Sequence, residues 1–150
     1  MRPVQFSREL VLQALCQWLI SGGELSEIEQ QFLNKVRSKR KRDNNISKKF
    51  FSNLFLNIPK KISILDEIIV PSLDRDLIEI GPTEKAALYI GVYELKFQPE
   101  IPYKVVINEA VRLTKIYGAE GAYKLINSSL DKIAQNVRRI QVSDKTNTKT

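Results

Sequence analysis

The chain has 150 residues, 43% of them hydrophobic, which is enough for one ordinary domain or two small packed subdomains. It has no histidine and one cysteine, Cys16, which excludes histidine-dependent catalysis, histidine-ligated metal sites and an internal disulfide. Its six glycines form neither a GxGxxG pattern nor a Walker A loop, and no apolar stretch approaches the ~20 residues of a membrane span. Composition therefore favours a non-enzymatic cytoplasmic protein without cofactor or metal, and it makes the net charge of +7 the number to explain.

Helical periodicity dominates the N-terminal part of the chain. Apolar residues spaced by three and four predict a first helix, with Ser7 as its N-cap and Gly22-Gly23 as its end. A second helix is expected over about 25–36, where Ile28, Phe32 and Val36 share one face.

The positive charge is concentrated directly after this second helix. Residues 35–49 hold eight basic residues and one acid, so this segment alone accounts for the net charge of +7. Like charges repel each other in a helix and Asn44-Asn45 favour a turn, which predicts an exposed loop over about 37–46. Such a loop suits contact with the phosphates of a nucleic acid. A solubilising loop or a contact with an anionic membrane surface is the alternative.

Five further helical segments bring the total to about seven. Ser47 is expected to cap a third helix that Pro59 ends, and a fourth covers about 60–70. A short helical piece is expected between Pro71 and Gly81.

The last three helices have clear boundaries. Gly81-Pro82 opens a fifth helix with Pro82 at its first position, the sixth begins near Tyr103 and ends at Gly118, and the seventh covers about 120–139. No segment alternates as a strand does, so the predicted fold class is all-α.

The predicted organisation is one helical domain over 1–140. The basic loop and the stretch from Pro71 to Gly81 divide it into two packed bundles, over about 1–70 and about 71–140. Residues 141–150 lack apolar periodicity and are expected to form a flexible tail.

An ordered series of motifs in the C-terminal half carries a family resemblance. The series reads PTEKAAL at 82–88, YEL at 93–95, IPYKVVINEAV at 101–111, LTK at 113–115, YGAE at 117–120, KLIN at 124–127 and LDKI at 130–133. Weaker matches reach the N-terminus at Arg8-Glu9, 13–15, Trp18 and 31–33. Together these motifs resemble the NusB family of bacterial transcription antitermination factors.

The resemblance implies an RNA-binding protein that is not an enzyme, with an all-α fold of two bundles. NusB proteins pair with NusE, a small-subunit ribosomal protein, and bind a boxA element in nascent RNA. With other Nus factors they help RNA polymerase to read through terminators, notably in ribosomal RNA operons. Two alternatives remain open: a NusE-binding adaptor with weak or no specific RNA binding, and an RNA-recognition module that acts with a ribosomal RNA modifying enzyme.

The resemblance and the charge pattern together nominate site residues. The expected RNA contacts are Arg2, Arg8, Lys39, Arg40, Lys41, Arg42, Tyr117, Glu120 and Lys124. The expected partner contacts are Glu84 and Tyr103. Structural roles remain open for several of them: Glu84 also suits the start of its own helix, and Tyr103 and Tyr117 also suit the edge of the core.

The chain departs from the family pattern at positions that matter for RNA. The family typically carries an arginine-rich stretch ahead of the first helix, where this chain has only Arg2 and Arg8. Cys16 stands where the family has an aromatic residue, and Leu125 stands where it has phenylalanine. Because a base stacked on an aromatic ring contributes about 1–3 kcal/mol, these two positions predict weaker stacking.

Overall fold

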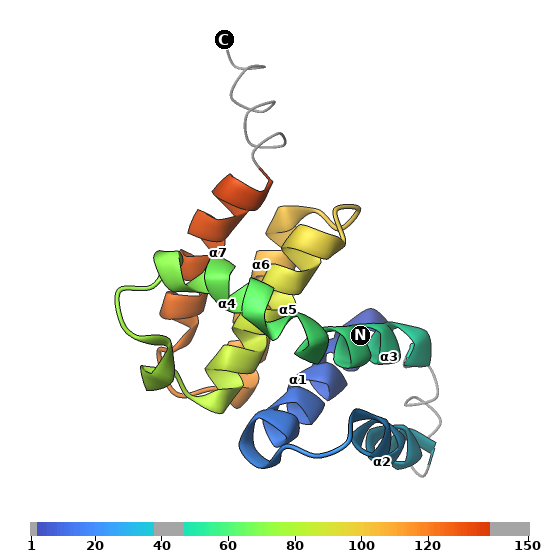
Figure 1. The fold of residues 1–150 in the computed structure, drawn as a ribbon. Helices are drawn as coiled ribbons and strands as arrows, with labels where there is room; N and C mark the ends of the chain where they lie inside the picture. Colours follow the sequence, from blue (N-terminus) through green and yellow to red (C-terminus); the bar gives the residue numbers. More distant parts are fainter. Residues whose placement is uncertain (1–2, 38–46, 139–150) are drawn as a thin grey trace. The chain divides into compact units, whose positions relative to one another are not determined.

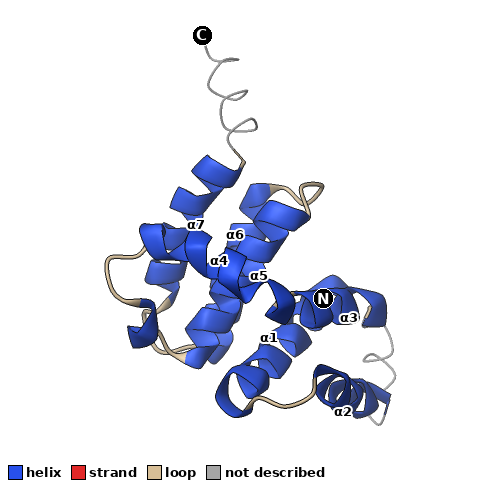
Figure 2. Cartoon of the chain, viewed as in Figure 1, coloured by secondary structure: helices blue, strands red, loops and turns tan. Residues whose placement is uncertain are grey.

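The computed structural model describes residues 3–37 and 47–138, and these residues form helices and loops without a strand (Figures 1 and 2). The α-helices are α1 (Pro3–Ser21), α2 (Leu25–Arg37), α3 (Lys48–Asn57), α4 (Ile62–Ile69), α5 (Pro82–Phe97), α6 (Tyr103–Tyr117) and α7 (Tyr123–Val137). Three short 3-10 helices are η2 (Pro59–Lys61), η3 (Val70–Ser72) and η4 (Leu77–Glu79). The prediction of an all-α fold with about seven helices is confirmed. None of the described helices combines the length and the apolar character needed to cross a membrane.

The chain divides into two compact units, Met1–Ile62 (unit 1) and Ser63–Thr150 (unit 2). The division falls at the start of α4, a little before the predicted boundary near residue 70. The packing of one bundle on the other remains a prediction. The predicted basic loop beyond Arg37 and the predicted tail at 141–150 lie outside the described residues.

Unit 1 is built from α1, α2 and α3, which contact one another in all three pairs. Phe32, Phe51 and Phe55 form its aromatic centre, with ring centroids 6.4 Å apart for Phe32 and Phe51 and 5.7 Å apart for Phe51 and Phe55. All three rings are buried, so they supply much of the apolar area that stabilises this small unit.

The two serines expected to cap helices in unit 1 have different roles. Ser47 caps α3 as predicted, because its side chain accepts a hydrogen bond from the amide of Phe50. The prediction for Ser7 is wrong, because α1 begins at Pro3 and Ser7 lies inside the helix. The buried Ser7 hydroxyl donates to the carbonyl of Ser47 at 3.0 Å, which ties α1 to the start of α3.

Unit 2 is organised around α5, which contacts both α6 and α7. Its residues from Ala86 to Leu95 are all buried, and all of them except Glu94 are apolar or aromatic, as expected for the central helix of a bundle. Gly91 allows the closest approach, because a Cβ at this position would lie 2.7 Å from Cδ1 of Leu130 on α7. The start of α5 is as predicted, with Gly81 as N-cap and Pro82 at the first helical position.

Two polar contacts fasten the outer elements of unit 2 to this centre. The hydroxyl of Tyr89 on α5 donates to Asp66 on α4 at 2.7 Å. Arg138, which follows α7, donates to four backbone carbonyls, those of Glu94, Leu95, Gln98 and Ile101, at 2.7–3.2 Å. The guanidinium thereby supplies charged donors to carbonyls at and just beyond the C-terminal end of α5.

Candidate functional site

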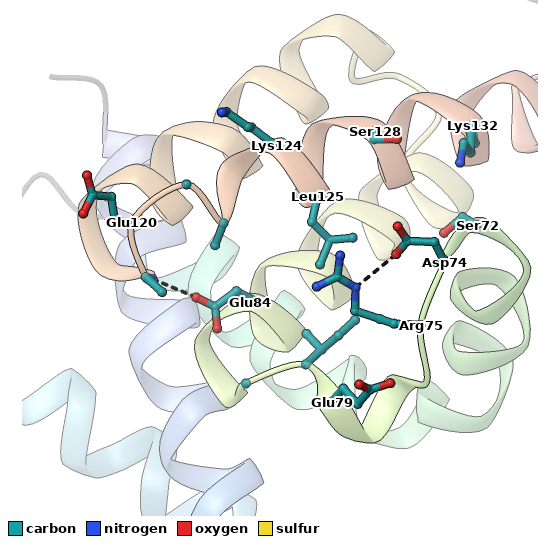
Figure 3. Close-up of a pocket in the computed structure, with 15 residues that line it drawn as sticks. Ser72, Asp74, Arg75, Glu79, Glu84, Glu120, Lys124, Leu125, Ser128 and Lys132 are labelled. Carbon is teal, nitrogen blue, oxygen red and sulfur yellow. Dashed lines mark hydrogen bonds and ion pairs between the residues drawn. The ribbon is translucent and has the colours of Figure 1, made fainter.

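A pocket of about 730 Å³ lies within unit 2 (Figure 3). Its walls come from the segment between η3 and the start of α5, from the α6–α7 loop (residues 118–122), and from one face of α7. Three of the predicted site residues, Glu84, Glu120 and Lys124, line this pocket. The fold therefore brings together a predicted partner contact and two predicted RNA contacts.

Glu84 joins the start of α5 to the α6–α7 loop. Its Oε2 accepts a hydrogen bond of 2.9 Å from the backbone amide of Ala119. A Cβ at Gly118 would lie 2.8 Å from that same Oε2 and 2.8 Å from the carbonyl oxygen of Thr114. The hydrogen bond between Glu84 and Ala119 therefore requires glycine at position 118. The motif YGAE contains this glycine, but the reason for it becomes visible only in the structure.

Two further features determine the course of the α6–α7 loop. The ammonium group of Lys115 lies 4.6 Å from the ring centroid of Tyr123, so a cation–π contact links the end of α6 to the start of α7. Gly121 has a φ of 80°, a left-handed conformation that favours glycine. The loop then presents Glu120 and Lys124 as exposed side chains.

The pocket is also lined by Arg75, Ser128 and Lys132, which are not among the residues predicted from the sequence. Arg75 pairs with its neighbour Asp74, with 3.0 Å between Nε and Oδ1. The hydrogen bond and the charge of Arg75, aided by the charge of Lys132, lower the pKa of Asp74. Lys124, Ser128 and Lys132 follow one another at intervals of four residues, a signal for a shared helix face that is visible in the sequence.

The acidic lining residues do not form a metal site. Glu79 accepts a hydrogen bond of 3.0 Å from the amide of Asp76, and the Asp76 side chain completes a capping box on η4. Over the whole described part of the chain, no cluster of three acidic or cysteine side chains is placed to hold a metal ion.

The two predicted tyrosines lie at opposite ends of α6. Tyr117, 38% exposed, ends the helix next to the α6–α7 loop. Tyr103 begins the helix and is partly buried. A helix of 15 residues is about 22 Å long at ~1.5 Å per residue. Tyr103 is therefore remote from the pocket.

Arg8 lies in unit 1 and is packed rather than solvated. Its side chain is 4% exposed, and Cζ of the guanidinium lies 5.2 Å from the ring centroid of Phe50. A phosphate contact by Arg8 therefore requires a different arrangement of the side chain. Arg2 and the run Lys39, Arg40, Lys41 and Arg42 lie outside the described residues, and their roles stay predictions.

A family model and many known proteins match this chain over most of its length. The model of the NusB family matches residues 5–135. The transcription antitermination protein NusB of Pasteurella multocida (strain Pm70) is 39% identical over 137 residues, which cover 91% of this chain and 92% of that protein. The protein of the same name from Histophilus somni (strain 129Pt) is 42% identical over 137 residues, covering 91% and 93%.

Solved structures share the fold as well. A crystal structure of antitermination factors NusB and NusE in complex with dsRNA matches with a TM-score of 0.77 and 26% identity, over 91% of this chain and 98% of that chain. The structure of T. maritima NusB matches with a TM-score of 0.73 and 29% identity, over 90% and 93%.

Proposed function

This chain belongs to the NusB family, and from that membership we propose that it is a transcription antitermination factor. It binds boxA RNA together with NusE, the small-subunit ribosomal protein, and supports read-through by RNA polymerase in ribosomal RNA operons. The observation that carries the proposal is the family match over residues 5–135, joined to a structural neighbour that holds NusB, NusE and dsRNA.

The proposed mechanism is binding without chemistry. Lys and Arg side chains contact RNA phosphates, which makes the affinity depend on salt, and unstacked bases read on the joint NusB–NusE surface give the specificity. Lys124 is exposed at the start of α7 and suits a phosphate contact, and Glu120 beside it suits hydrogen bonds from base amino groups. Tyr117 offers an exposed ring at the end of α6 for stacking.

Outside the described residues, the proposal keeps Arg2 and the basic run from Lys39 to Arg42 as phosphate contacts. This run carries the charge that the N-terminus of the chain lacks relative to the family pattern. It thus takes the place of the family's arginine-rich stretch.

For the partner, the proposal assigns Glu84 and Tyr103 to the NusE-binding surface. The assignment of Glu84 is supported by its place in the pocket lining and by its hydrogen bond to the amide of Ala119 in the α6–α7 loop. Tyr103 is supported by its half-buried position at the start of α6. NusE, other Nus factors and RNA polymerase then assemble with the protein in the cytoplasm, where bacterial transcription takes place.

Two observations favour a second candidate, a NusE-binding adaptor with weak or no specific RNA binding. Arg8 is buried against Phe50, and Leu125 offers no ring for stacking. Both features reduce the RNA-binding surface that the family pattern implies.

Transcription in vitro tests the antitermination proposal. A template carries a boxA leader upstream of an intrinsic terminator, and a matched template carries a scrambled leader. Adding the protein with NusE and the other Nus factors is expected to raise read-through on the boxA template alone. Equal read-through on both templates would reject antitermination by this chain.

A further inference from the structure

Arg75 presents unused hydrogen-bond donors to the pocket of unit 2. Its Nε is engaged by Asp74, but neither terminal nitrogen donates a hydrogen bond to any other residue that the structure describes. The side chain is 47% exposed. Figure 3 shows the guanidinium group pointing into the pocket beneath Leu125. A planar group with two open nitrogens matches a phosphate or a carboxylate, which both accept paired hydrogen bonds.

The acidic groups around Arg75 are already engaged. Asp74 accepts from Arg75, Glu79 accepts from the amide of Asp76, and Glu84 accepts from the amide of Ala119. Glu120, the remaining acid of the lining, is drawn pointing away from the pocket in Figure 3. These carboxylates keep their negative charge, so the groups that can bind an anion are the unused donors of Arg75 and of α7 rather than the pocket as a whole.

Three hydrogen-bond donors on α7 also line this pocket: Lys124, Ser128 and Lys132, which we call the α7 row. All three side chains are exposed. Their spacing of four residues puts them on one face of the helix, and the row extends for about 12 Å at ~1.5 Å per residue. Positive charge is thus repeated along the pocket instead of gathered at one point.

We propose that this pocket binds consecutive phosphates of single-stranded RNA, with Arg75 taking one phosphate through its terminal nitrogens. Lys124 and Lys132 contact the flanking phosphates, and the Ser128 hydroxyl donates to a phosphate oxygen between them. RNA is favoured over a carboxylate of a protein partner because a row of spaced cations matches a polymer with a charge at each residue, whereas one carboxylate needs only Arg75. Leu125 adds an apolar side chain to the lining, which suits a sugar or a base edge. The proposal rests on the proposed RNA-binding function and adds Arg75, Ser128 and Lys132 to it.

The first test compares salt dependence in the full chain with NusE present. Binding of a labelled boxA RNA is measured by fluorescence anisotropy over a salt series for the wild type, for Arg75→Gln with Lys132→Gln, and for Lys104→Gln. Lys104 is exposed on α6 outside the pocket lining, so its replacement is the control for loss of one positive charge away from the pocket. We expect the slope of log affinity against log salt to fall by about 0.7 for each phosphate that the variant no longer neutralises. Lys104→Gln is expected to keep the wild-type slope.

The second test places the contact on the RNA. Single phosphates are replaced in turn by uncharged methylphosphonates, and each RNA is bound to the wild type and to Arg75→Gln. We expect one position where neutralisation weakens binding to the wild type several-fold but has no effect on Arg75→Gln. Additive effects at every position would overturn the assignment of Arg75.

The remaining outcomes separate this proposal from the function on which it rests. A wild type that binds no RNA overturns both. If the wild type binds RNA and the variant with both Arg75 and Lys132 replaced keeps the wild-type salt slope, the proposed phosphate contacts of the pocket are wrong but the RNA-binding function stands. If the variant loses affinity for NusE and keeps its RNA slope, the pocket takes a protein carboxylate and the RNA assignment is wrong.

Discussion

Glu84 and Ala119 are 35 residues apart in the sequence, yet Oε2 of the first accepts a 2.9 Å hydrogen bond from the amide of the second. The contact fixes the α6–α7 loop against the start of α5. Because this loop carries Glu120 and leads into Lys124, we expect Glu84 to influence ligand binding through the position of the loop, in addition to the NusE contact proposed for it.

Replacement of Glu84 separates these two roles. Glu84→Ala removes the acceptor, so the amide of Ala119 is expected to exchange hydrogen faster and the protein to lose about 1 kcal/mol of unfolding free energy. Glu84→Gln retains a carbonyl acceptor and is expected to keep the amide protected. Hydrogen exchange followed by NMR measures both. An unprotected Ala119 amide in Glu84→Gln would show that the charge, not the acceptor, holds the loop.

Gly118→Ala is expected to weaken both stability and binding. The added Cβ would lie 2.8 Å from the carbonyl oxygen of Thr114, which belongs to the backbone and cannot turn away. We expect a loss of about 1–3 kcal/mol, the usual range for overpacking, together with weaker binding of NusE and RNA.

Gly91→Ala is the matched control, because its Cβ would meet Leu130 in the core of unit 2, remote from the α6–α7 loop in sequence. It is expected to lower stability without lowering affinity at temperatures where the protein is folded. Urea unfolding and binding isotherms report the two quantities. Equal loss of affinity in both variants would mean that Gly118 has no special role in the site.

Arg138 is expected to be among the costliest single replacements in unit 2. Arg138→Gln leaves carbonyls at the end of α5 without their charged donor, and the side chain is only 6% exposed. We expect the free energy of unfolding to fall by about 2–4 kcal/mol, and by less in Arg138→Lys, which keeps a donor. Chemical denaturation measures both. A loss below about 0.5 kcal/mol in Arg138→Gln, the effect of an ordinary surface replacement, would contradict this role.

We predict that Tyr89 lowers the free energy of unfolding of unit 2 at alkaline pH. Burial, together with the hydrogen bond to Asp66, raises the pKa of Tyr89 above its usual value. The folded state therefore favours the protonated phenol. Its contribution to stability is complete below about pH 10, the usual pKa of tyrosine, and falls as the pH rises from there toward the raised pKa.

Tyr89→Phe tests that dependence. The variant is expected to be about 1 kcal/mol less stable at neutral pH, because it lacks the hydrogen bond, and to lose less stability above about pH 10. Tyr93, whose pKa is also raised by burial, contributes to the slope that remains. Denaturation series at several pH values measure the slopes. Equal alkaline slopes in the variant and the wild type would contradict the assignment to Tyr89.

Local signals were sufficient to predict much of the fold. Pro82, Gly118 and Ser47 mark helix ends through fixed dihedral angles or side-chain acceptors, and those ends lie where the sequence predicts them. Ser7 was misassigned because a serine before an apolar stripe looks like a cap, whereas its partner, Ser47, is 40 residues away.

The candidate site could be predicted only in part. Glu84, Glu120 and Lys124 lie in motifs whose order carries the family resemblance, and all three line the pocket. Arg75 lies in a segment without periodicity, and its place in the pocket results from the packing of unit 2. The burial of Arg8 against Phe50 likewise depends on a residue far along the chain.

The basic run after α2 provides a further prediction for RNA binding. Changing Arg37, Lys39, Arg40, Lys41 and Arg42 to glutamine is expected to flatten the salt dependence of RNA binding, by about 0.7 in slope for each phosphate left without a cation. An unchanged slope would exclude this run from the RNA surface and leave it a solubilising role.

The most direct test of the account is fluorescence anisotropy of a labelled boxA RNA and a scrambled RNA, each with and without NusE, over a salt series. We predict that NusE tightens binding of boxA RNA but not of the scrambled RNA, with a salt slope that reports the phosphate contacts. Binding of NusE without any preference for boxA RNA would contradict it and would identify the protein as an adaptor.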